Sequence, residues 1–271
     1  MPMQMVELHF SRPPQCDYAA IKSRAEAILG EELDAPDPAR AQHAFLLFHK
    51  SHPIQYREGA VPAQTAILAA NEAVDLAKYQ GEIEQSWGFR ECADALRDSR
   101  HTLLVTEMMA RALPPGERVR LFHGVLQAVV EATAPQALVF KHSQQVVRPQ
   151  AYLEAAGDEP ILRPGALNVR FFNIAEPAGD MLMDTRGLEE TGLHDLQCHF
   201  RGLEPNEVSR VLYNTAVYIF EKGAVIESGN TVAGITPGST WRCQFEDALI
   251  APKRELLDLD PGSPYAAGGR H

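Results

Sequence analysis

The chain has 271 residues, of which 45% are hydrophobic and 23% charged, and its formal net charge at pH 7 is −11. This composition is typical of a folded globular protein and excludes wholesale disorder. An acidic chain repels the phosphate backbone of nucleic acids, which disfavours nucleic-acid binding. No apolar run of the sequence approaches the roughly 20 residues that a membrane helix needs.

The first residues run directly into a strand pattern and lack a basic segment followed by an apolar one, so we expect no signal peptide and a cytoplasmic protein. Four scattered cysteines form no C-x-x-C pair, which favours reduced, buried thiols over a zinc ribbon or a disulfide framework. These cysteines are Cys16, Cys92, Cys198 and Cys243.

Alternating apolar residues predict a strand at 6–10, and Asp17 is placed to cap a helix that follows it. The continuous apolar run at 44–48 predicts a central strand. The alanine-rich segment 63–79 and the segment 82–96 are both expected to be helical, although Gly88 weakens the second pattern.

A second group of elements follows up to residue 156. Strands are predicted at 101–106 and 137–140, separated by a helix that Pro114 opens and that carries a wide apolar stripe. A short helix is expected at 148–156.

The second half has the clearest pattern. Its helix is opened by Pro205 and ended by Gly223. The predicted elements, in order, are a strand at 165–172, a turn at 185–188, a helix at 204–222, a strand at 225–226, a turn at 229–232 and a strand at 241–250.

Short connections and adjacent strands predict an α+β fold with mixed or mostly antiparallel sheets, helices packed on one face, and two linked halves. We expect an N-terminal half at residues 1–158 and a C-terminal half at 159–259. Residues 260–271 are rich in proline and glycine and are expected to form a flexible tail.

Several motifs of this pattern resemble the bacterial domain-of-unknown-function family numbered 4261 (DUF4261), over an expected range of 5–235. The motifs are Leu167–Phe171, Thr185–Leu188, Gly192–Leu196, Tyr218, Gly223–Ile226 and Gly229–Gly234, with His101–Val105 and Ala137–Phe140 as central strands. The resemblance implies a fold and carries no catalytic role. Members of similar families of small acidic bacterial proteins often act as immunity proteins, which neutralise antibacterial toxins, and the resemblance permits this role here.

No assembled catalytic or cofactor motif is visible, so we expect neither a cofactor nor a metal ion. The sequence lacks a phosphate-binding glycine loop and a G-x-S-x-G elbow. Cys198 lies beside His199 and close to His194, but neighbouring residues of a strand point to opposite faces. His49 and His52 are three residues apart and resemble the end of a strand more than a metal site.

Charge is concentrated in the second half. Residues 151–271 contain 10 Lys+Arg and 18 Asp+Glu, a net charge of −8, which leaves −3 for residues 1–150. Six acidic residues and one basic residue lie between Glu176 and Asp195. Such a surface attracts a basic protein. Our candidates for contact with a partner are Asp180, Asp184, Glu189 and Glu190.

The leading hypothesis is a non-enzymatic immunity protein that binds a cognate toxin, such as a basic nuclease, through this acidic surface. One alternative is a hydrolase or transferase whose site is assembled from distant loops around Cys198 or the histidines at 194–199. Another is an adaptor within a secretion system. The sequence leaves the oligomeric state open.

Overall fold

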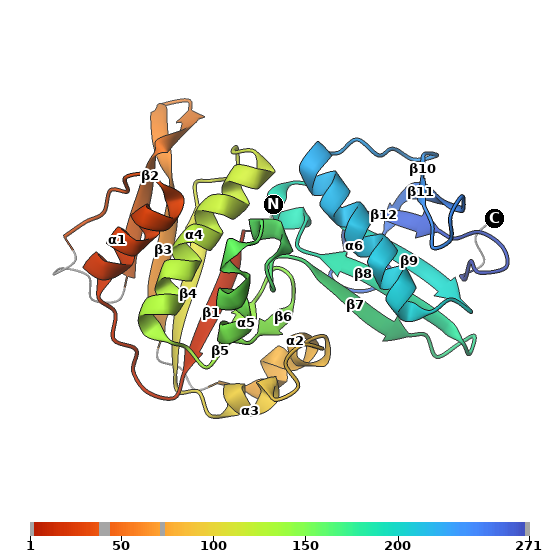
Figure 1. Cartoon of the computed structure of the whole chain (residues 1–271), viewed down its shortest axis with the longest axis horizontal. Coiled ribbons are helices and arrows are strands. Elements are labelled where there is room, and N and C mark those ends of the chain that lie inside the picture. The colour runs from red at the N-terminus through yellow and green to blue at the C-terminus, as the bar shows by residue number, and fades with distance from the viewer. Residues whose placement is uncertain (1–2, 38–43, 71–73, 269–271) are drawn as a thin grey trace. The chain divides into compact units, whose positions relative to one another are not determined.

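The computed structural model describes residues 3–37, 44–70 and 74–268 (Figure 1). It divides into two compact units, an N-terminal unit of residues 1–166 and a C-terminal unit of residues 167–271. Each unit combines helices with a six-stranded sheet, which confirms the predicted α+β class. No helix within the described ranges is both long and apolar enough to cross a membrane.

The N-terminal unit is built on an antiparallel sheet with the strand order β2-β3-β4-β1-β5-β6. Every neighbouring pair in this order runs antiparallel. The strands are β1 (Met5–Phe10), β2 (Ala44–Tyr56), β3 (Gly59–Ala70), β4 (His101–Met108), β5 (Ala137–Phe140) and β6 (Gln145–Val147). Strands β2 and β3 form the long hairpin in orange in Figure 1.

Helices α1 (Tyr18–Leu29) and α4 (Pro115–Thr133) pack on this sheet and against each other. Asp17 caps α1 as predicted, because its carboxylate accepts a hydrogen bond from the Ala20 N–H at 3.0 Å. Gly124 lets the two helices approach closely, since a Cβ at this position would collide with Leu29. The shared apolar core therefore lies between these helices and the sheet.

The β5–β6 end of the sheet is apolar on both faces. Leu138 and Phe140 belong to the core under α4, whereas Ala137 and Val139 alternate to the other face and pack with α3 (Cys92–Arg97). The remaining short helices of this unit are η2 (Leu76–Tyr79), α2 (Gln80–Glu84), α5 (Pro149–Glu154), η3 (Ala155–Gly157) and η4 (Pro160–Leu162).

Two sequence predictions for this unit are wrong. The segment 63–79 was expected to be helical, but residues up to 70 form β3, which pairs on both sides with β2 and β4. The run at 44–48 belongs to β2, which lies at the edge of the sheet rather than in its centre. In the first case strand pairing overrides local helix propensity, and in the second the strand forms but takes an edge position. The unit also extends to residue 166 rather than 158, because η4 packs against α4.

The C-terminal unit contains a second six-stranded sheet, with the order β10-β11-β12-β9-β8-β7. Its strands are β7 (Asn168–Asn173), β8 (Asp180–Arg186), β9 (Leu196–Arg201), β10 (Thr231–Ala233), β11 (Thr240–Asp247) and β12 (Glu255–Asp260). The pairing of β12 with β9 is parallel, and the other pairs are antiparallel. The pattern at 225–226 predicted a strand that is not formed, and β12 was not predicted.

Helix α6 (Pro205–Lys222) lies across β7, β8 and β9 (Figure 1). It begins with a proline at its first turn and ends at Gly223, whose φ of 83° places it among the conformations that favour glycine, as the sequence predicted. The short helix η5 (Glu189–Thr191) connects β8 to β9.

The end of the described chain does not form the expected flexible tail. The Arg201 N–H donates to the Tyr265 carbonyl at 2.9 Å, and Ala266 forms a β-bridge with Phe200. Ala267 is 1% exposed. These backbone bonds fix residues 265–267 beside β9, and residues 269–271 lie outside the described part.

Candidate partner-binding surface

The four carboxylates predicted to contact a partner lie on β8 and on η5. Asp180, Asp184 and Glu190 are 2%, 1% and 1% exposed, and Glu189 alone is partly open, with 33% of its side chain exposed. Asp180 and Asp184 belong to β8, which lies between β7 and β9 inside the sheet, and Glu190 belongs to the short helix that follows β8. The sequence therefore predicted as exposed three side chains that the fold buries.

Asp184 is held by two arginines that are distant in the sequence. Arg170 on β7 donates to it through Nε at 2.8 Å and through Nη2. Arg254 donates to the same carboxylate through Nη2 at 2.9 Å. A forked guanidinium matches a carboxylate in shape, so this arrangement satisfies a buried charge that would otherwise be costly.

Asp180 is compensated in a similar way at the opposite end of β8. Arg201 Nε lies 3.1 Å from Asp180 Oδ1, and His199 Nε2 lies 3.6 Å from Oδ2. With both oxygens engaged and the side chain buried, this carboxylate offers nothing to a partner protein.

Glu189, Glu190 and Asp195 surround Arg186. The Arg186 guanidinium lies 3.2 Å from Glu189 and 3.5 Å from Glu190. Asp195 Oδ1 accepts hydrogen bonds from the Thr185 hydroxyl and the Leu188 N–H. Burial, together with repulsion from Asp195, raises the pKa of Glu190 to about 8, and burial raises the pKa of Asp195 to about 6. The cluster is a buried structural network.

The cysteine and histidines considered for catalysis do not converge. Cys198 is fully buried on β9, and its neighbour His199 points to the other face, as the strand geometry predicted. The His194 ring packs against that of Phe245 in a tilted arrangement, with ring centroids 4.8 Å apart. Within the described ranges, no three histidine, cysteine or acidic side chains are arranged to hold a metal ion.

His49 and His52 belong to a network around Glu31 in the N-terminal unit. His52 Nε2 lies 2.9 Å from Glu31, and His49 Nε2 lies 3.0 Å from the Thr65 hydroxyl. The row of hydroxyl, imidazole and carboxylate resembles a hydrolytic triad. However, Thr65 and His49 are each only 1% exposed, so no substrate reaches the hydroxyl. Burial lowers the pKa of His49 to about 4.

The C-terminal unit has an open groove between α6 and the segment 225–234. Its volume is about 780 Å³. Tyr218 and Val225 are 48% and 49% exposed at its sides. The other lining residues are Arg210, Val211, Asn214, Thr215, Ile226 and the run from Gly229 to Gly234. Two segments singled out in the sequence, Tyr218 and 229–234, thus meet at one surface.

Strand β10 lines this groove and pairs with only one other described strand, β11. The Cys243 N–H donates to the Asn230 carbonyl, and the Gly234 N–H donates to the Ser239 carbonyl, so within β10 the backbone groups of Val232, which pairs with Trp241, point toward β11. Just before the strand, the Gly229 N–H also donates to the Cys243 carbonyl. Because these groups alternate along a strand, those of Thr231 and Ala233 face away from β11. Strand β10 is the edge of its sheet among the described strands. Such an edge is a template for a further strand.

The comparisons with known proteins concern this unit. Residues 184–260 match the model of the family described as Domain of unknown function (DUF4261), which confirms the predicted family for that part of the chain. The match contains the whole groove and does not include the strands at 101–105 and 137–140. No curated protein and no solved structure is significantly similar to the chain.

Proposed function

We propose that this chain, with its DUF4261 region at 184–260, is a non-enzymatic binding protein that holds an extended segment of another protein in the groove between α6 and β10. The partner segment adds a strand to β10 and places apolar side chains against Tyr218 and Val225. This mode of recognition uses main-chain hydrogen bonds for affinity and side-chain pockets for selectivity.

The observation that carries the proposal is the coincidence of two features in one place. An exposed aromatic ring is common on protein surfaces, and so is an edge strand. Here Tyr218 and the free edge of β10 line the same groove, inside the residues that match the family. Aromatic residues are frequent anchors of protein interfaces.

Among the described residues, the one charged side chain that lines the groove is Arg210, which pairs with Glu207. Asp180, Asp184 and Glu190 are buried, but two exposed acidic residues, Glu221 and Glu227, lie on the segments that flank the groove. Glu221 follows Tyr218 by three residues, which places the two side chains on one face of α6. Glu227 precedes β10 in the loop that bounds the groove. These two residues take the role that the sequence assigned to the buried carboxylates.

The partner that we propose is an antibacterial toxin, and the chain is then its immunity protein. The support is the sequence resemblance and the net charge of −11, which suits a basic toxin such as a nuclease. An immunity protein of this kind acts by occupying its partner's surface and needs no catalytic group of its own.

The test is protection of a bacterium that expresses a candidate toxin encoded next to this gene. We expect the wild-type chain to restore growth and to copurify with the toxin. Tyr218→Ala and Glu227→Lys should weaken the complex, and Ala233→Pro should do so by removing an outward N–H without breaking the ladder to β11.

Each variant has a matched control. Leu249→Ala removes another exposed apolar side chain of the same unit, Asp247→Lys reverses another exposed charge, and Ala233→Val keeps the N–H. If the three groove variants protect and copurify as well as their controls, the groove is not the binding surface. If no neighbouring gene product binds the wild-type chain, the immunity role is wrong.

A further inference from the structure

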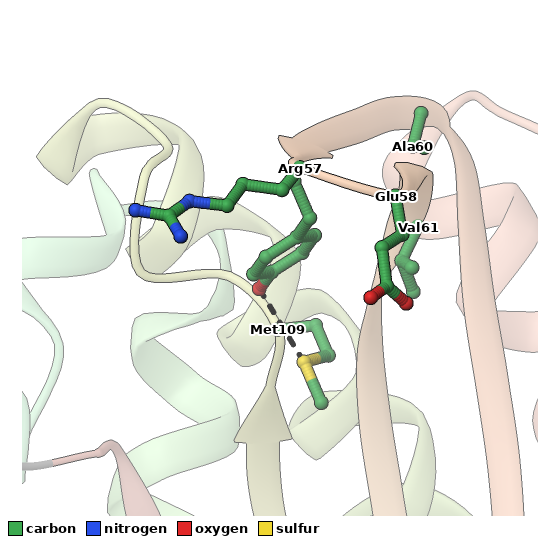
Figure 2. Close-up of a pocket in the computed structure, with 7 residues that line it drawn as sticks. Arg57, Glu58, Ala60, Val61 and Met109 are labelled. Carbon is green, nitrogen blue, oxygen red and sulfur yellow. Dashed lines mark hydrogen bonds between the residues drawn. The ribbon is translucent and has the colours of Figure 1, made fainter.

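A second hollow lies in the N-terminal unit, where the β2–β3 hairpin meets the end of β4. It consists of two adjoining cavities of about 790 Å³ and 260 Å³, which share Tyr56 and Met109. Figure 2 shows Arg57 and Glu58 at the hairpin tip and Met109 below them. The Tyr56 hydroxyl lies 3.4 Å from the Met109 sulfur.

The smaller cavity contains a buried guanidinium. Arg118, on α4, is 2% exposed and lines the cavity together with Glu107. Its Nε lies 3.2 Å from Glu107 Oε2, and its Nη2 also donates to this carboxylate. Glu107 accepts further hydrogen bonds from the backbone and the side-chain amide of Gln4, at 3.1 and 3.2 Å. Both carboxylate oxygens of Glu107 are therefore occupied by hydrogen bonds.

The third guanidinium nitrogen of Arg118, Nη1, takes no part in these hydrogen bonds. Nη1 is buried and has no hydrogen-bond partner among the described residues. An unsatisfied donor on a charged group is costly in a protein interior, and native structures rarely keep one without a use. Arg118 lines the smaller cavity, and its Nη1 lies just beneath the cavity surface.

The charges and apolar groups around the cavity indicate the chemical class of the ligand that would supply this acceptor. Arg118 and Arg111 outnumber Glu107, so the lining carries one net positive charge. Met3, Tyr56 and Met109 add exposed apolar surface, at 51%, 47% and 44%. An anion with an apolar body satisfies both features.

We propose that this cavity binds a small monocarboxylic acid, with its carboxylate on Arg118 Nη1 and its apolar chain between Tyr56, Met109 and Met3. The exposed area of Nη1 is below 1 Å², so the ligand enters by displacing the side chains above it. Met3 and Met109 suit that movement, because an unbranched thioether changes rotamer readily. The site is independent of the groove in the C-terminal unit.

The test uses hexanoate as the probe and the full chain, with binding measured by titration calorimetry and ligand-observed NMR. Hexanoate should bind with a dissociation constant of about 1 mM or lower. Hexanamide, which has the same shape and no charge, and inorganic phosphate, which has charge and no apolar chain, should each bind about tenfold more weakly. Equal binding of either compound contradicts the proposal, as does the absence of hexanoate binding.

Two variants locate the site. Arg118→Lys keeps a cation beside Glu107 and removes the spare nitrogen, so hexanoate affinity should fall about tenfold. Arg111→Gln changes an exposed residue and should reduce the affinity about threefold, whereas Lys253→Gln in the other unit should not change it. If Arg118→Lys does not fold, Arg111→Gln and the hexanamide comparison decide. Unchanged affinity in Arg111→Gln and in a folded Arg118→Lys overturns the proposal.

Discussion

Burial lowers the pKa of two histidines in the N-terminal unit and raises the pKa of two carboxyl groups in the C-terminal unit. The N-terminal unit encloses histidines, with His49 and His123 at 1% and 0% exposure. The C-terminal unit encloses carboxylates, among them Asp184, Glu190 and Asp195, and places arginines against them. The N-terminal unit also contains a buried ion pair, Arg118 with Glu107, and in both units some buried polar atoms have no hydrogen-bond partner among the described residues.

This difference gives the units opposite responses to pH. Burial lowers the pKa of His49 from 6.5 to about 4 and that of His123 well below its usual value. The unfolded chain then binds more protons at acid pH, so the N-terminal unit loses stability as the pH falls from 6.5 toward 4. Glu190 has its pKa raised from 4.5 to about 8, so the C-terminal unit loses stability as the pH rises across that range.

The largest expected effect comes from breaking the buried ion pairs. Arg254→Met leaves Asp184 and Asp195 with one cation fewer, and we expect the C-terminal unit to lose about 3–5 kcal/mol. Hydrogen exchange measured on the full chain by mass spectrometry reports each unit separately. Peptides from β1 and α4 serve as the internal control and should keep their protection. A loss below 1 kcal/mol would mean that the network is not tightly closed.

Glu190→Gln should remove the loss of stability that the C-terminal unit shows as the pH rises. The amide resembles the protonated carboxyl group, so the variant should match the wild type near pH 4.5 and be more stable at pH 8 by on the order of 3 kcal/mol. Denaturant unfolding monitored by exchange at both pH values measures the difference. Glu221→Gln controls for the loss of one negative charge, and equal pH profiles for wild type and Glu190→Gln would contradict the assignment.

His49→Gln should reduce the loss of stability of the N-terminal unit at acid pH. Gln keeps a partner for the Thr65 hydroxyl and cannot take up a proton, so the N-terminal unit should keep on the order of 2 kcal/mol more of its stability between pH 6.5 and 4. The measurement is the pH dependence of the unfolding midpoint. His194→Gln, which changes a half-buried histidine of the other unit, should leave the profile of the N-terminal unit unchanged.

The smallest effect concerns a single helix end. Asp17→Ala removes the hydrogen bond that caps α1 and should cost about 1 kcal/mol in the N-terminal unit alone. Asp17→Asn keeps an acceptor and should restore most of this loss. A matching loss in both units would show that they unfold together.

The sequence predicts the elements that carry their own end signals. Asp17, the proline at the start of α4 and Gly223 mark the ends of three helices correctly. Segment 59–70 has no such signal, and its strand depends on pairing with β4, some forty residues later in the chain.

The prediction of the partner-contact residues is wrong for a related reason. Acidic residues that are close in the sequence predicted a surface patch. In the fold, Arg170 and Arg254, which are 14 and 70 residues from Asp184 in the sequence, form hydrogen bonds with the Asp184 carboxylate and neutralise its charge. The groove likewise joins Tyr218 to a strand edge that only the folded sheet creates.

The insertion of β12 between β11 and β9 has a consequence for the order of events during synthesis. The N-terminal unit is complete once residue 166 leaves the ribosome and can fold while translation continues. The second sheet cannot close until residues 255–260 have been made, because its centre is supplied last. Until then the groove beside β10 has no finished sheet behind it, so its final shape depends on a strand that follows the groove residues in the chain.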